Sequence, residues 1–325
     1  MQSPEPNPQS RSAVSYRATW LATLATTSYI ALIAAIGAGT GLSFVLFPEL
    51  GALSHDILRR PHGIWARAPW MLVITPLLTG LAGTLITRHF AYGAVSVLAT
   101  IGAALIIIRL LRSPITPAIS AGLLPLTLGE PSWWYPPSLL AGLSLLAILS
   151  QVRRRIVPLP PATSGRAGAG DVSERAPSDY TWIPFFLLFL IAALTLIVFT
   201  GWRLLLFPPL VVIGFEMFAR ASTCPWAGRP FVVPLVCTSS AASGVILVGV
   251  FGVGPLAAAL SIGCSIVILH AFKLHLPPAL AVGLLPFVIS HPSNEFPVAV
   301  AAGTALLAAS FTAWRRIFHR SRTTQ

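Results

Sequence analysis

The chain has 325 residues, of which 55% are hydrophobic and only 9% are charged. A soluble domain carries about 25% charged residues, so this composition excludes an ordinary soluble protein. The net charge of +12 would suggest a nucleic-acid partner for a soluble chain, but most basic residues here flank hydrophobic segments. The positive-inside rule and attraction to anionic lipid explain that placement better, so we expect a lipid bilayer and no nucleic acid as partner.

Long apolar runs predict membrane-spanning helices. The runs at 24–46, 183–202 and 239–269 contain no Asp, Glu, Lys or Arg. Each is long enough to cross a hydrocarbon layer of about 30 Å, which takes about 20 residues. The first run is far longer than the apolar core of a cleavable signal peptide, which has about 7–15 residues. The predicted fold class is therefore an all-α, polytopic transmembrane helical bundle.

The chain divides into two similar units. Residues 1–17 are polar and predict a disordered tail, 151–181 predict a flexible basic linker, and 315–325 form a basic tail. The first transmembrane unit occupies 18–150 and the second 182–314. Five hydrophobic segments fall in each unit: 18–46, 69–87, 90–111, 115–129 and 135–150, then 182–206, 230–250, 253–272, 276–290 and 296–314.

The two units resemble each other in sequence. The stretch Pro117 to Pro125 reads PAISAGLLP, and 161 residues later, from 117 to 278, the chain reads PALAVGLLP. The turn FPEL at 47–50 recurs as FPPL at 207–210. A duplicated apolar unit with prolines inside its membrane segments is a common plan of transporters.

The number of crossings follows from the short segments and the charges. Segments 115–129 and 276–290 carry two or more prolines each, and 15 residues reach only about 22 Å as a helix, so a half-length or re-entrant helix fits them. Four crossings per unit would collect 12 Lys and Arg residues on the side of the termini and linker, against seven on the other. The positive-inside rule prefers this arrangement of eight crossings in parallel repeats, with termini and linker cytoplasmic. Ten crossings with inverted repeats remain the alternative.

Basic residues precede each short proline-started segment. In each unit two of them lie at equivalent places before the prolines, and the second unit adds a third: Arg109 and Arg112 before Pro117, then His270, Lys273 and His275 before Pro277 and Pro278. Free amides at a helix start favour negative charge, so cations beside that start predict an anion-binding site. The alternative is a positively charged loop with His275 at the membrane interface.

One acid follows the first segment of each unit, with an arginine four residues later. Asp56 precedes Arg60, and Glu216 precedes Arg220. We expect these to form structural ion pairs that brace a loop, or carboxylates that carry protons or gate a pathway. The three cysteines have no metal-ligand or disulfide spacing. No nucleotide-binding or catalytic motif occurs, so we expect no metal, no cofactor and no enzyme activity.

The proline motifs resemble those of the HPP family of integral membrane proteins. The similar residues are the turn Phe207, Pro208 and Pro209 and the run His275-Leu276-Pro277-Pro278. Residues 183–314 resemble such a unit well and the first half weakly, so the chain looks like a tandem pair of HPP-like units. The family's motif has no leucine after its histidine, and the first half has no histidine at this place. The resemblance implies a four-helix unit and a transport role, and some members of the family are implicated in nitrite transport.

Two hypotheses of function follow, together with a weaker third. The first is a transporter or channel for a small inorganic anion, nitrite being one candidate, with sites at the paired proline turns. The second is a non-transporting membrane scaffold or accessory subunit. The third is a lipid-handling membrane enzyme that uses His275 as a base. We expect an integral protein of a bacterial cell membrane, and a homo-oligomer is compatible with the sequence.

Overall fold

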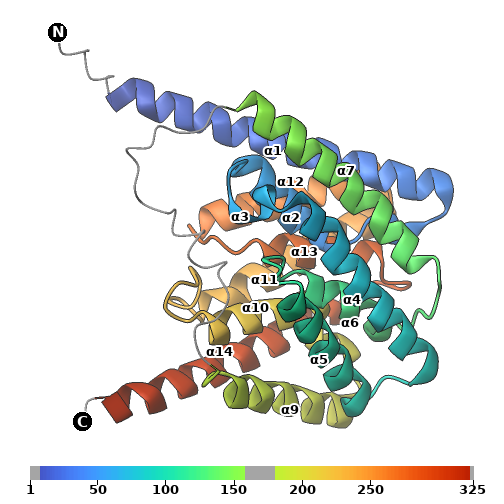
Figure 1. The fold of residues 1–325 in the computed structure, drawn as a ribbon, viewed down its shortest axis with the longest axis vertical. Coiled ribbons are helices and arrows are strands. Elements are labelled where there is room, and N and C mark those ends of the chain that lie inside the picture. The colour runs from blue at the N-terminus through green and yellow to red at the C-terminus, as the bar shows by residue number, and fades with distance from the viewer. Residues whose placement is uncertain (1–7, 158–179, 323–325) are drawn as a thin grey trace.

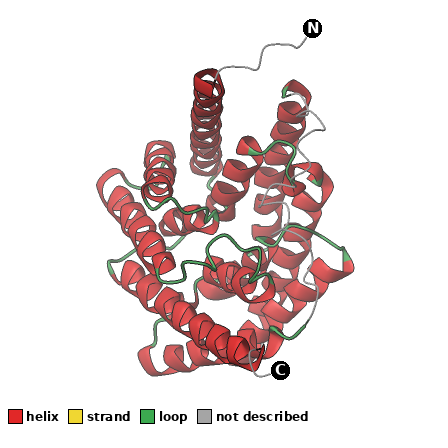
Figure 2. Cartoon of the chain, turned by 90° about the vertical axis from the view of Figure 1, so that its left-hand side faces the viewer, coloured by secondary structure: helices red, strands yellow, loops and turns green. Residues whose placement is uncertain are grey.

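The computed structural model describes residues 8–157 and 180–322. Within these ranges the chain folds into helices joined by short loops, with no β-strand (Figure 2). The predicted all-α class is confirmed.

The first half contains seven α-helices and one short 3₁₀ helix. They are α1 (Pro8–Thr40), η1 (Ser43–Val45), α2 (Glu49–Arg59), α3 (Ile64–Arg67), α4 (Pro69–His89), α5 (Ala94–Leu110), α6 (Ala118–Leu128) and α7 (Tyr135–Ile156). The second half follows a similar order. It contains α9 (Ile183–Thr200), η2 (Arg203–Leu206), α10 (Pro208–Ala219), α11 (Val232–Phe251), α12 (Pro255–Ala271), α13 (Pro278–Leu284), η3 (Leu285–Phe287) and α14 (Glu295–Arg322).

Within the described ranges, six helices are long and apolar enough to cross a membrane: α1, α4, α7, α9, α11 and α14. Helices α5 and α12 have 17 residues each, which is about 26 Å of helix and the lower limit for a span. The chain is therefore a polytopic membrane protein. These six helices, together with α5 and α12, correspond to the eight full-length segments expected from the sequence.

Four short helices form the centre of the bundle. Helices α2, α6, α10 and α13 lie between the long helices in Figure 1, and nearly all their residues are buried. Helix α2 packs against α13, and α10 packs against α6. The central helices of each half therefore contact those of the other half. Sequence analysis identified α6 and α13 as short segments but interpreted the regions of α2 and α10 as loops, which is wrong.

The backbone approaches most closely where α4 crosses α6 and where α11 crosses α13. A Cβ atom added to Gly83 would lie 1.9 Å from the carbonyl oxygen of Gly122, and one on Gly244 would lie 2.2 Å from that of Gly283. Small residues at such crossings let membrane helices pack closely. These four glycines are required for the central helices to sit against their neighbours.

The basic residues gather at one end of the bundle. Helix α1 begins, α7 ends, α9 begins and α14 ends toward the left of Figure 1, and we call this the linker end. The Arg154 side chain of α7 donates to the carbonyl of Ala66 over 3.4 Å, and Arg315 of α14 donates to that of Ala227 over 3.0 Å. The loops that follow α2 and α10 therefore lie at the linker end.

At the far end lie Arg88, which donates to the carbonyl of Pro131 over 2.9 Å, and Arg203, which stacks on Tyr92. Sequence analysis placed 12 Lys and Arg residues on the side of the termini and linker and seven on the other, and several of these residues lie at the opposite end from the one expected. Helices α2 and α10 return the chain to the linker end, so Arg59, Arg60, Arg67, Arg220 and Arg229 lie there and Arg88 does not. Among the described residues, the basic side chains are therefore more concentrated at one end of the bundle than predicted.

The unit boundaries also differ from those expected. Helix α1 begins at Pro8, so most of the expected tail at 1–17 is helical. Helix α14 continues to Arg322 through most of the basic tail. Helix α7 ends at Ile156, and the rest of the predicted linker lies mainly outside the described residues.

Candidate functional site

The two proline turns have the same backbone geometry. After α5, the amide of Arg112 bonds to the carbonyl of Arg109, and that of Ser113 bonds to Ile108. After α12, Lys273 bonds to His270, and Leu274 bonds to Leu269. Both are Schellman ends, in which one residue takes the left-handed conformation that glycine usually occupies. Arg112, with φ 49°, and Lys273, with φ 50°, are the two non-glycine residues with positive φ in the described ranges.

The helix starts beyond these turns do not offer free amides. At α6, the amides of Ala118, Ile119 and Ser120 bond to carbonyls three residues back. At α13, Pro278 has no N–H, and Ala279 and Leu280 are bonded in the same way. The prediction that exposed amide donors form an anion site is therefore wrong, because the preceding turn already accepts these hydrogen bonds. An anion at these turns would have to be held by side chains.

The two acid–arginine pairs are present, on helices rather than in loops. Arg60 pairs with Asp56 near the end of α2, and Arg220 pairs with Glu216 near the end of α10. The side chains of Asp56, Glu216 and Arg220 are buried, and that of Arg60 is 27% exposed. In each pair the acid and the arginine lie one helical turn apart, on a helix that other helices surround.

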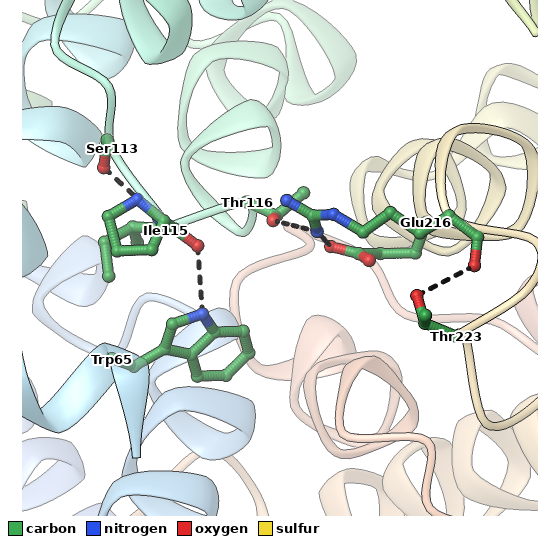
Figure 3. A network of polar contacts seen from close by, with 8 residues as sticks. Trp65, Ser113, Ile115, Thr116, Glu216 and Thr223 are labelled. Carbon is green, nitrogen blue, oxygen red and sulfur yellow. Dashed lines mark hydrogen bonds and ion pairs between the residues drawn. The ribbon is translucent and has the colours of Figure 1, made fainter. Parts of the chain in front are cut away.

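Each ion pair contacts the proline turn of the other half. Arg220 of the second half donates to the Thr116 hydroxyl of the first-half turn over 3.2 Å. His275 of the second-half turn lies 3.8 Å from the Asp56 carboxylate of the first half. Figure 3 shows the first of these contacts, with Trp65, the turn at Ser113 to Thr116 and Glu216 in one network. Helices α2 and α10 thus each carry an ion pair to the proline turn of the other half.

A cavity of about 570 Å³ opens beside the second-half turn. Six of its lining residues carry basic side chains, and none is acidic: His55, Arg59 and Arg60 from α2, and His270, Lys273 and His275 from α12 and its turn. We call this cavity the basic vestibule. Its walls come from both halves, because the end of α2 packs beside α13.

A second, much smaller cavity lies next to the vestibule. Its volume is about 30 Å³, close to that of one water molecule, and it shares Arg60, His275 and Pro277 with the vestibule. Thr116 and Pro117 of the first turn and Pro278 of the second also line it, with Glu216 and the indoles of Trp65 and Trp226. We call this the inner cavity. The two proline turns therefore face one confined space.

The two tryptophans of the inner cavity differ in their contacts. The Trp65 indole donates to the carbonyl of Pro114 over 3.0 Å and so anchors the first turn. The Trp226 indole N–H is buried and has no hydrogen-bond partner among the described residues, and the same holds for one carboxylate oxygen of Glu216. The side chains of Trp65 and Trp226 are both buried.

Some predicted site residues lie elsewhere. Arg109 contacts Tyr180, both by a hydrogen bond and with its guanidinium 5.0 Å from the ring centre, so it does not reach the vestibule. Arg112 is exposed on its turn and lines neither cavity. Phe207, Pro208 and Pro209 are buried at the start of α10, where Phe207 packs on Phe296. These three residues position the helix and do not line a cavity.

Sequence analysis missed His55 and Arg59 of the vestibule. Both lie on α2 next to Asp56 and Arg60, so they belong to a run of ionisable residues at 55–60. That run was the available signal. The spacing of four residues between acid and base is typical of a helix, although sequence analysis interpreted the region as a loop. Its packing against α13 could not be read from the run.

His275 is held in its neutral form by its surroundings. Burial and, to a smaller extent, repulsion by the guanidinium groups of Arg60 and Arg59 together lower the pKa of His275 from 6.5 to about 4. Asp56 faces the same ring, and His270 and Lys273 share the cavity. Arg59, Arg60 and Lys273 are the arginine and lysine side chains on the vestibule wall, and Arg60 is paired with Asp56.

Comparison with protein-family models, curated proteins and solved structures finds no match for this chain. The resemblance to the HPP family therefore rests on the sequence motifs alone.

Proposed function

We propose that the protein is a membrane transporter or channel for a small inorganic anion. The observation that carries this proposal is the basic vestibule, a cavity of about 570 Å³ with six basic side chains and no acidic one on its walls. A cleft lined by one sign of charge between low-dielectric walls concentrates ions of the opposite sign. The polytopic helical bundle supplies the membrane-crossing frame that such a function needs.

The strained lysine supports a functional role for the second turn. A left-handed residue with a Cβ costs about 1–2 kcal/mol, and glycine would avoid that cost. Lys273 nevertheless occupies such a position and lines the vestibule. Arg112 carries the same strain outside both cavities, so the support for Lys273 comes from strain and cavity lining together.

The inner cavity and its ion pairs act as the gate in this proposal. Glu216 and Arg220 lie across the path from the first turn, and Arg60 borders both cavities. The inner cavity is too small for a hydrated anion, so passage requires the pairs to separate. By the positive-inside rule the linker end faces the cytoplasm, which makes the vestibule a cytoplasmic opening in a bacterial cell membrane.

Ion flux through purified protein in liposomes tests the proposal. The panel of anions includes nitrite, nitrate and chloride, because the resemblance to the HPP family suggests nitrite. Lys273→Ala and Arg59→Ala should each lower the flux several-fold, since each removes a fixed charge from the vestibule. Arg67→Ala is the matched control, because Arg67 is an exposed arginine at the same end that lines neither cavity. Equal flux in all three variants and the wild type would remove the proposed site.

A membrane scaffold is the second candidate, and the closed interior favours it. The confined space between the turns has room for about one water molecule. A scaffold would show no flux for any anion in the panel. It would also tolerate neutral substitution of Lys273 and Arg59 in a growth assay.

A further inference from the structure

Glu49 is a buried acid that none of the contacts described so far uses. It begins α2, and its exposed fraction is 0%. In the part of the chain that the structure describes, neither of its carboxylate oxygens has a hydrogen-bond partner. Glu49 also takes part in none of the ion pairs of the described ranges. An isolated buried carboxylate is very costly, whereas the neutral acid is not.

The neighbours of Glu49 come from α6 and α7. The Ser120 hydroxyl lies close enough to interact with the carboxyl, although the two groups do not meet hydrogen-bond geometry and Ser120 has no other partner. Tyr135 also lies near the carboxyl and donates its own hydroxyl proton to the carbonyl of Ala121 over 2.7 Å. Ser120 is therefore free to accept a hydrogen bond, and Tyr135 is not free to donate one.

In the second half, the positions equivalent to Glu49, Ser120 and Tyr135 carry residues without polar side chains. The residue at 209, which corresponds to Glu49 in the FPEL and FPPL turns, is proline. At the offset of 161 residues, from 117 to 278, Ser120 corresponds to Ala281 and Tyr135 to Phe296. The polar group at each of the three positions is thus absent from the second half. The second half thus forms a similar arrangement of helices without a carboxyl at this place.

The donor set fits a proton better than a metal ion. Calcium takes about six to eight oxygen ligands and magnesium about six, and the carboxyl and one hydroxyl fall far short of either number. No group of three or more His, Cys, Asp or Glu side chains in the described ranges could hold a metal. The start of a helix favours negative charge, so position and burial act on the carboxyl in opposite directions. A carboxyl under such opposed influences can both hold and release a proton.

We propose that Glu49 is a proton-binding site, occupied as the neutral acid facing Ser120, whose release of the proton is coupled to anion movement through the vestibule. The coupling element is α2, which carries Glu49 in its first turn and Arg59 in its last. The proton passes between water and the carboxyl, and no bond to carbon changes. The coupling part rests on the proposed anion transport, whereas the occupancy of the site does not.

Infrared spectroscopy of the reconstituted protein tests the occupancy without any transport assay. At neutral pH the wild type should show the carbonyl band of a protonated carboxyl, and Glu49→Gln should lose it. Glu295→Gln is the matched control, because Glu295 is an exposed acid at the start of a helix and its replacement should leave the band unchanged. A wild type without this band, or a band that survives in Glu49→Gln, would overturn the proton site.

Flux with and without a proton gradient tests the coupling. In the wild type an inward proton gradient should raise anion flux several-fold, and in Glu49→Gln the flux should be the same with and without the gradient. Ser120→Ala introduces the second-half residue and should weaken the response while preserving flux. A full response to the gradient in Glu49→Gln would refute the coupling. No anion flux in the wild type would refute the transport function instead and leave the infrared result to decide the proton site.

Discussion

Replacing Lys273 by glycine should make the protein more stable and less active. Lys273 holds φ at 50°, a left-handed conformation that costs about 1–2 kcal/mol for a residue with a Cβ. Glycine removes that cost but adds about 0.5–1 kcal/mol of chain entropy to the unfolded state. The expected net gain is about 0.5–1 kcal/mol, or a rise in melting temperature of about 1–3 °C.

Lys273→Ala separates the charge from the strain. Alanine keeps the Cβ and therefore the strained backbone, so the melting temperature should stay near that of the wild type. Anion flux should fall to the same level in the glycine and alanine variants, because both lack the ammonium group in the vestibule. Only the glycine variant should gain stability.

A thiol-reactive fluorogenic dye can measure unfolding in detergent. Cys224 and Cys237 are buried and become reactive as the fold opens, and Cys264 is exposed, so a Cys264→Ser background removes the early signal. If the glycine variant is no more stable than the alanine variant, the backbone of residue 273 is not strained. Undiminished flux in both would refute the role of Lys273 in the vestibule.

Three further predictions follow from packing, charge and pH. Gly83→Ala places a methyl group 1.9 Å from a carbonyl oxygen of α6 and should lower the free energy of unfolding by about 1–3 kcal/mol. Gly102→Ala has open space around it and should be neutral or stabilising in the same melting assay. Equal melting temperatures of the two variants would contradict the close crossing. Arg220→Ala leaves the buried Glu216 without its arginine partner and should lower the free energy of unfolding by about 3–5 kcal/mol. The double variant with Glu216→Gln should recover part of that loss. If the effects of the two substitutions simply add, the pair is not coupled. The pKa of His275 is lowered from 6.5 to about 4 in the folded protein, so the unfolded chain binds the proton first as the pH falls. The wild type should therefore lose stability relative to His275→Gln as the pH falls from about 6.5 to about 4. If the melting temperatures of the two proteins change in parallel across this range, the lowered pKa is contradicted.

The amino-acid sequence alone determined the class of fold and the local pairs. Uncharged runs of about 20 residues have no stable place except a membrane, and a membrane leaves helices as the way to satisfy their backbone. The pairing of Asp56 with Arg60 and of Glu216 with Arg220 could be predicted because residues four apart face each other on any helix. The shared turns before Pro117 and Pro278 could be recognised because their residue types recur.

Only the tertiary structure decided which of these features form a site. The vestibule exists because the end of α2 packs beside α13, a contact between residues more than 200 positions apart that no local pattern encodes. The same packing leaves Arg109 and Arg112 outside the cavity, although their spacing matches that of His270 and Lys273. Likewise, Glu49 reads as an ordinary acid at a helix start until the surrounding helices separate it from water and from every counter-charge in the described ranges. Sequence patterns report neighbours along one helix, whereas burial and long-range contacts depend on how all the helices pack together.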